Sequence, residues 1–206
     1  MDHNTARTRR PNRRVVAGAI AATACIGATA ALTSASTAYA GASEGSGTAA
    51  RSAAAAPQAK LSLVTSSPEL KKCFPHAWAR VKVDLTTDEI GKDTFRIDAS
   101  GLKPRTTFTV FLLEKAASPF GAAEYIGDFT TDRWGKAHNT YQLIVEEAFA
   151  FNNETGSRTD LNSVGFWFAD PKADDSCLGA GSPVTGFDGD ASAGVQMMNS
   201  GGHKLP

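Results

Sequence analysis

Residues 77–85 read Ala-Trp-Ala-Arg-Val-Lys-Val-Asp-Leu, a run in which aliphatic and charged side chains alternate. Successive side chains of a β-strand point to opposite faces, so the alternation predicts a strand with one buried face and one wet face. The inward set is Val81, Val83 and Leu85, and the outward set is Arg80, Lys82 and Asp84. This stretch therefore favours an antiparallel β-fold over a helical one.

The same pattern recurs along the chain, interrupted by turn residues. Phe95, Ile97 and Ala99 alternate with polar residues, whereas residues 107–113 are apolar on both faces, as in a central strand. Further strands are expected over residues 124–131, 136–145 and 164–168 and around Val195, and a short helical turn over residues 146–149. Seven or eight short strands with turns between them predict an all-β fold, a single antiparallel β-sandwich.

Residues 97–110 read Ile-Asp-Ala-Ser-Gly-Leu-Lys-Pro-Arg-Thr-Thr-Phe-Thr-Val. This segment resembles the corner of fibronectin type III and related immunoglobulin-like domains, where Gly-Leu-x-Pro turns the chain between two sheets. The resemblance implies an immunoglobulin-like sandwich in which Leu102 fills the core and Pro104 fixes the turn. Phe108 stands where such corners usually have Tyr, so the hydroxyl that bonds back to the backbone is missing. The resemblance transfers no active site, because those domains are mostly binding or spacing modules.

The first forty residues have the order of a cleaved secretory signal. Five arginines precede an uncharged, Ala-rich run, and the small-x-small pattern Ala38-Tyr39-Ala40 follows it. A membrane anchor is the alternative, but Ala, Gly and Thr partition weakly into lipid. Cys25 weakly resembles a lipoprotein site, and Arg13-Arg14 a twin-arginine signal. We expect a secreted protein, with lipid anchoring or cell-wall association as alternatives. The mature chain also looks like secreted bacterial proteins of unknown function.

The composition divides the remainder into three parts. Residues 41–60 are poor in large apolar side chains and are expected to be a flexible linker. Residues 61–198 would be the β-sandwich, and residues 199–206 a disordered tail. Without residues 1–40 the chain has 16 basic and 20 acidic residues, a formal charge of −4. This balance argues against a nucleic-acid partner, and after cleavage no stable membrane span is expected.

Two cysteines remain after removal of the leader, Cys73 and Cys177. In an exported chain such a pair is expected to form a disulfide, here between the two ends of the domain. Buried free thiols are the alternative. A metal site is less favoured, because neither cysteine belongs to a Cys-x-x-Cys motif.

The turn Asp132-Arg-Trp-Gly135 lies between two expected strands, and its glycine can adopt the positive φ that such turns need. An aromatic ring at a turn either anchors a sugar or a protein partner or folds back onto the sheet. Trp134 is therefore a candidate partner contact, with packing onto the sheet as the more common outcome for such a ring.

Acidic residues cluster on both sides of Cys177. Hard cations such as calcium take about six to eight oxygen ligands from flexible loops. The candidate ligands of a structural calcium ion are Asp170, Asp174, Asp175, Asp188 and Asp190. Solvated loop acids and turn caps are the alternative, and no other cofactor is expected.

Other catalytic patterns are sparse. His76 and His138 are far apart in the sequence and lack metal-ligand spacing. Glu124 and Asp128 could share a strand face, but a hydrolytic pair needs a cleft with a fixed separation. We therefore expect a secreted or cell-surface, non-catalytic binding or structural module, whose partner is an extracellular protein or glycan. The alternative is a small secreted hydrolase that uses the acidic loop residues.

Overall fold

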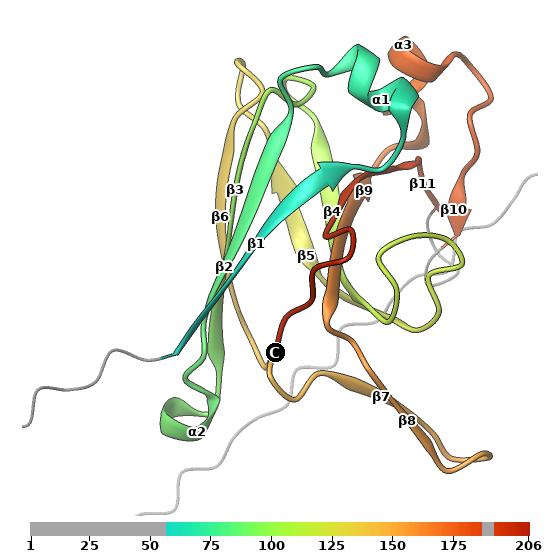
Figure 1. The fold of residues 1–206 in the computed structure, drawn as a ribbon. Coiled ribbons are helices and arrows are strands. Elements are labelled where there is room, and N and C mark those ends of the chain that lie inside the picture. The colour runs from blue at the N-terminus through green and yellow to red at the C-terminus, as the bar shows by residue number, and fades with distance from the viewer. Residues whose placement is uncertain (1–56, 187–191) are drawn as a thin grey trace, which may run out of the picture. The chain divides into compact units, whose positions relative to one another are not determined.

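Eight strands of the chain form one antiparallel sheet in the order β5-β4-β9-β12-β1-β2-β3-β6 (Figure 1). The computed structural model describes residues 57–186 and 192–206. The predicted signal peptide and most of the predicted linker lie outside the described residues. The strands are β1 (Gln58–Thr65), β2 (Trp78–Asp84), β3 (Asp93–Ser100), β4 (Thr107–Leu113), β5 (Ala123–Thr130), β6 (Ala137–Leu143), β9 (Ser163–Phe168) and β12 (Gln196–Asn199).

Shorter elements join or extend these strands. Two hairpins stand outside the main sheet, and the helices are one or two turns long. The hairpin strands are β7 (Phe149–Asn152) with β8 (Ser157–Asp160), and β10 (Thr185–Gly186) with β11 (Ser192–Ala193). The helices are α1 (Pro68–Cys73), α2 (Thr87–Ile90), the 3-10 helix η1 (Pro171–Ala173) and α3 (Asp175–Leu178). The short helical turn expected over residues 146–149 is a hydrogen-bonded turn that leads into β7.

The sheet consists of two four-stranded halves that are joined by a short pairing. β1 pairs with β2 along most of its length, and its last residues, Val64 and Thr65, pair with β12. The free edges of β5 and β6 also approach each other, since Asn139 Nδ2 donates to the Asp128 carbonyl oxygen at 3.2 Å. The prediction of an all-β antiparallel fold is therefore confirmed. The sheet is a nearly closed barrel, however, rather than two clearly separate sheets, because β1 continues from one half into the other.

Close packing at the seam between β5 and β6 depends on a glycine. A Cβ atom at Gly127, which has φ 143°, would lie 2.5 Å from the Tyr141 ring. The Tyr141 ring packs edge-on against Phe95 inside the sheet. Burial raises the pKa of Tyr141 to about 12. The seam is therefore filled by an aromatic ring that only a residue without a side chain can accommodate.

The alternating residues of the sequence form the core as predicted. Val81, Val83, Phe95 and Ile97 are fully buried. Phe108 lies at the centre of an aromatic cluster, with ring centroids 5.0–5.4 Å from three neighbours. Those neighbours are Phe129, Phe166 and Phe168. Each such ring removes a large apolar area from water, which is the dominant favourable term in folding.

The corner between β3 and β4 is closed by a threonine instead of a tyrosine. Leu102 is buried, as the immunoglobulin-like resemblance implies. The Thr131 hydroxyl donates to the Lys103 carbonyl oxygen at 2.6 Å and accepts from the Thr106 amide at 3.0 Å. Phe108 has no hydroxyl, so the polar bond that fixes this corner comes from the end of the neighbouring strand.

We expect Thr131→Val to lower the free energy of unfolding by about 1–3 kcal/mol, because it leaves the buried Thr106 amide without its acceptor. Chemical denaturation measures this change. Thr107→Val is the matched control, since the Thr107 hydroxyl is hydrogen-bonded to the exposed Thr130 hydroxyl. Equal losses in the two variants would show that Thr131 does not fix the corner.

The predicted disulfide is present. Cys73, at the end of α1, is bonded to Cys177 in α3, with a Cα–Cα distance of 5.8 Å. Lys103 reinforces this end of the domain by donating to the Ala173 carbonyl oxygen at 2.6 Å. The bridge therefore ties the segment before β2 to the segment after β9.

Ordered structure extends slightly beyond residues 61–198 at both ends. β1 begins at Gln58, inside the expected linker. The expected disordered tail packs onto the sheet, because Leu205 is buried and its amide donates to the Asn162 carbonyl oxygen at 2.7 Å. Further bonds at its start, including the one from the Ser200 amide to the Val164 carbonyl oxygen at 2.8 Å, also hold this segment, which composition alone marks as a tail.

Candidate functional site

The outer face of β1, β2, β3 and β6 carries most of the polar side chains that these strands direct away from the core. Strand register places Lys60, Lys82 and Arg96 in one row, and Ser62, Arg80, Asp98 and His138 in the next. We call this surface the basic face and define it by Lys60, Arg80, Lys82, Asp84, Arg96, Asp98 and His138. Four permanent cations lie there against two carboxylates.

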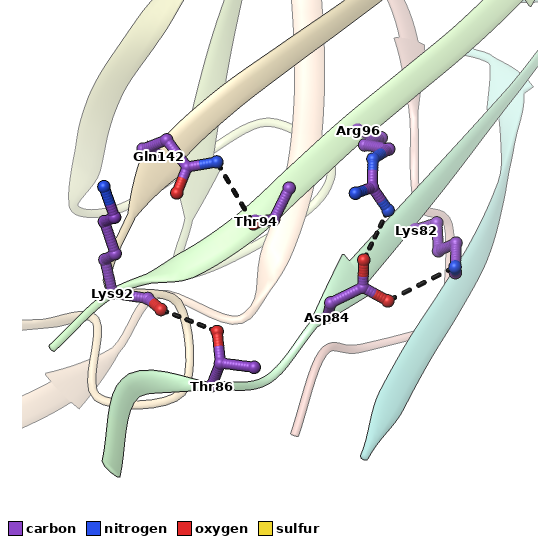
Figure 2. Close-up of polar contacts among 7 residues, drawn as sticks. All are labelled: Lys82, Asp84, Thr86, Lys92, Thr94, Arg96 and Gln142. Atoms are coloured by element: carbon purple, nitrogen blue, oxygen red, sulfur yellow. Dashed lines mark hydrogen bonds and ion pairs between the residues drawn. The ribbon is translucent and has the colours of Figure 1, made fainter. Parts of the chain in front are cut away.

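Asp84 holds two of these cations. Its carboxylate accepts from Arg96 and lies 3.2 Å from Lys82 Nζ (Figure 2). Burial raises the pKa of Asp84, but the two cations lower it by more, so the pKa lies below its usual range. In contrast, no ion pair within the described part of the chain involves Lys60 or Arg80. These two cations are available to a ligand.

An open groove of about 820 Å³ lies at the end of this face where β2 begins and β3 ends. Trp78, which is 49% exposed, and Arg80 line it from β2. The remaining lining residues come from the ends of β3, β5 and β6 and from the turn between β5 and β6: Asp98, Ala99, Ser100, Thr130, Thr131, Asp132, Lys136, Ala137 and His138.

His138 and Asp98 face each other across β3 and β6 inside the groove. The His138 Nδ1 atom contacts the Asp98 carboxylate, and both side chains are well exposed to solvent. The pair resembles the base and its orienting acid in a nucleophilic site. Among the described residues, however, no serine, threonine or cysteine side chain is hydrogen-bonded to His138. The arrangement offers a ligand a hydrogen-bonding pair rather than an activated nucleophile.

The turn between β5 and β6 borders the groove and presents Trp134. The Asp132 carboxylate accepts from the backbone amides of Trp134 and Lys136 at 2.8 and 2.9 Å. The Lys136 bond is the main reason that the pKa of Asp132 lies below its usual range. Gly135 has φ 72°, as predicted for this turn.

Trp134 does not fold back onto the sheet. It is 62% exposed, and the Arg133 guanidinium lies 3.9 Å from its ring centroid. A stacked guanidinium stabilises an exposed ring only modestly, so most of the ring stays available for a partner.

The acidic loop residues have separate local roles. Asp174 is fully buried, where its carboxylate accepts from the Ser182 hydroxyl and from the Val195 amide at 2.8 Å. Asp170 caps η1 by accepting from the Lys172 amide at 2.9 Å, and Asp175 lies in the first turn of α3. Asp188 and Asp190 lie outside the described residues. No cluster of three or more metal-ligating side chains occurs in residues 57–186 and 192–206. The calcium site stays a prediction.

The candidate hydrolytic carboxylates on β5 are not brought together. A bulge in β5 places Ile126 between the residues that pair with Val110 and Phe111 of β4. One additional residue reverses the side-chain alternation, so Glu124 and Asp128 point to opposite faces. The pKa shifts resolved for carboxyl groups of the described residues are all downward, whereas a general acid needs a raised pKa.

The sequence did not predict the groove or a role for Trp78, although the alternation along β2 indicates that Trp78 is exposed. Trp78 has the same parity as Arg80 and Lys82, so the alternation that predicts β2 also places its indole on the outer face. An exposed tryptophan beside an exposed arginine is a stronger indication of recognition than either residue alone.

Comparisons with known proteins give no family for this chain. No family model matches it, and the search of curated proteins finds no similar sequence. Within the described residues, no helix has the length and apolarity needed to cross a bilayer.

Proposed function

We propose that this protein is an exported, non-catalytic recognition module that binds an extracellular ligand in the groove beside the β5–β6 turn. The observation that carries this proposal is the open groove of about 820 Å³, lined by the half-exposed Trp78 and bordered by the turn of Trp134. Aromatic rings that stay in water without a structural reason are common at sites of recognition.

Export is supported by the leader pattern and by the disulfide. The Cys73–Cys177 bond is of the kind that persists in oxidising compartments. We further propose that the domain is related in fold to immunoglobulin-like domains, which the buried Leu102 and the Thr131 bond at the same corner support. Domains with such corners commonly bind their ligands with loops and sheet faces.

The chemistry of the groove favours binding over hydrolysis. The Asp132 carboxylate is occupied by two backbone amides, and Asp98 faces His138. A hydrolase that works with two carboxylates needs one with a raised pKa and a fixed separation between them. The small secreted hydrolase that uses the acidic loop residues stays a prediction.

Retention on a cell envelope tests the proposal. We expect the full chain to co-sediment with the insoluble cell-envelope fraction of its own host. Trp78→Ala and Trp134→Ala should each weaken this retention by about tenfold, which is the size of a typical aromatic anchor. The amount of protein in the pellet, measured against the concentration of envelope, gives the affinity.

Phe151→Ala is the matched control, because Phe151 is 53% exposed and lies on β7, outside the main sheet. Its retention should equal that of the natural chain. Oxidative footprinting gives a second readout: the envelope should protect Trp78 and Trp134, while the buried Trp167 stays unmodified throughout. Unchanged retention and unchanged footprints in both tryptophan variants would remove the groove from the function.

A further inference from the structure

The basic face next to the groove favours a negatively charged ligand. Four permanent cations lie on it, and only Lys82 and Arg96 have a carboxylate partner there, which they share. The chain without its leader has a formal charge of −4, so the rest of the mature chain is acidic while this face carries an excess of cations. Such segregation favours an anionic ligand on this face.

The spacing of the cations suits an extended chain. Trp78, Arg80 and Lys82 are alternate residues of β2, so their side chains leave the same face about 6.8 Å apart. Lys60 and Arg96 flank Lys82 on the neighbouring strands, about 4.8 Å away on each side. A linear ligand that lies along β2 would meet an aromatic ring first, then one cation, and then a row of three.

The other polar groups on this face suit a ligand rich in hydroxyls. Ser62, Thr94, Ser100, Thr140 and Gln142 are directed outward on β1, β3 and β6. Gln142 is placed by its bond to Thr94 Oγ1 at 3.1 Å (Figure 2). Only Ser100 of this group pairs directly with Trp78, and the others lie farther along the face. Hydroxyl and amide groups can bind sugar hydroxyls, and an aromatic ring can stack against the apolar side of a sugar ring.

From this arrangement we infer that the groove and the basic face bind a linear anionic polysaccharide, with a sugar ring on Trp78 and acidic groups at Arg80 and Lys60. The inference rests on the proposed recognition function and names its class of ligand. A nucleic acid fits less well, since strong nucleic-acid binders have a basic stripe with few carboxylates. Here Asp84 and Asp98 interrupt the cations.

Polygalacturonate tests the inference, because its fully methyl-esterified form has the same backbone without the charges. Binding of the full, oxidised chain to each polymer is measured by affinity electrophoresis. We expect polygalacturonate to bind at least about tenfold more tightly than the ester, and the preference to fall as salt rises toward about 0.5 M.

Charge reversal identifies the residues. Arg80→Glu and Lys60→Glu should each weaken polygalacturonate binding by about tenfold or more, while Arg80→Lys should keep most of it. Lys204→Glu is the matched control, since it makes the same charge change at an exposed position outside the basic face. Circular dichroism confirms that each variant is folded, and Lys60 at the exposed edge of β1 provides a second site if Arg80→Glu does not fold.

The possible outcomes separate the two proposals. Equal binding of the acid and the ester, lost in Trp78→Ala, would overturn the anionic ligand and keep the groove as a recognition site. Binding to anionic lipid vesicles or to single-stranded DNA with the same charge dependence, and none to polygalacturonate, would also overturn the polysaccharide. Retention on the host envelope that survives both tryptophan substitutions would remove the proposed function itself.

Discussion

Replacing Asp93 by Ala is expected to lower the free energy of unfolding by about 3–5 kcal/mol. The Asp93 carboxylate is fully buried at the start of β3 and accepts from four backbone amides. Oδ1 accepts from Thr86 and Thr87 at 2.7 and 3.0 Å, and Oδ2 accepts from Val145 and Glu146 at 2.8 and 3.3 Å. The carboxylate therefore joins the loop before α2 to the end of β6, and its loss leaves several amides without an acceptor.

The effect of pH identifies the charged form of Asp93 as the stabilising one. Burial raises the pKa of this carboxyl, but its hydrogen bonds, of which the one from the Val145 amide is the strongest, lower it by more. The pKa therefore lies below its usual value of 3.8. A lowered pKa in the folded state means that the stabilisation is present above about pH 3.8 and is lost as the pH falls through the folded-state pKa.

Denaturation curves from neutral pH down to about pH 2 measure this dependence. The difference between the natural chain and Asp93→Asn should be largest at neutral pH and should shrink below pH 3.8. Asp88→Asn, which removes an exposed carboxylate from α2, is the control and should change stability little. A difference that does not vary with pH would contradict the role of the ionised carboxylate.

Removing the Cys73–Cys177 bridge by replacing both cysteines with serine is expected to cost about 2–4 kcal/mol. The bridge joins residues 104 positions apart, so it strongly restricts the unfolded chain. It also holds α1 against α3 at one end of the sheet, close to the contact between Phe74 and Phe168. Thermal denaturation of the oxidised protein and of the double variant gives the difference.

A reducing agent provides the internal control for this prediction. It should destabilise the natural chain by about the same amount and leave the double variant unchanged, because the variant has no bridge to lose. Mass spectrometry of the protein isolated from its own host adds a direct check. Two free thiols at Cys73 and Cys177 would show that the bridge plays no part in the natural fold.

Local alternation was enough to determine the main strands. β2, β3 and β4 lie where the inward and outward sets of residues predict them, since one buried face imposes a period of two on any half-buried strand. The pairing of Cys73 with Cys177 could also be predicted from the sequence, because they are the two cysteines left beyond the predicted leader. The hairpin of β7 and β8 was missed, because its aromatic side chains are exposed and leave no pattern of burial.

Only the tertiary structure decided the closure of the sheet and the composition of the site. Trp78 and Lys136 line the same groove, because the start of β2 and the start of β6 both pair with the end of β3. Asp174 was expected on a solvated loop, yet the fold buries it against the Val195 amide. The sequence thus determined which residues alternate along each strand. Long-range pairing, which no local pattern encodes, decided which of them meet.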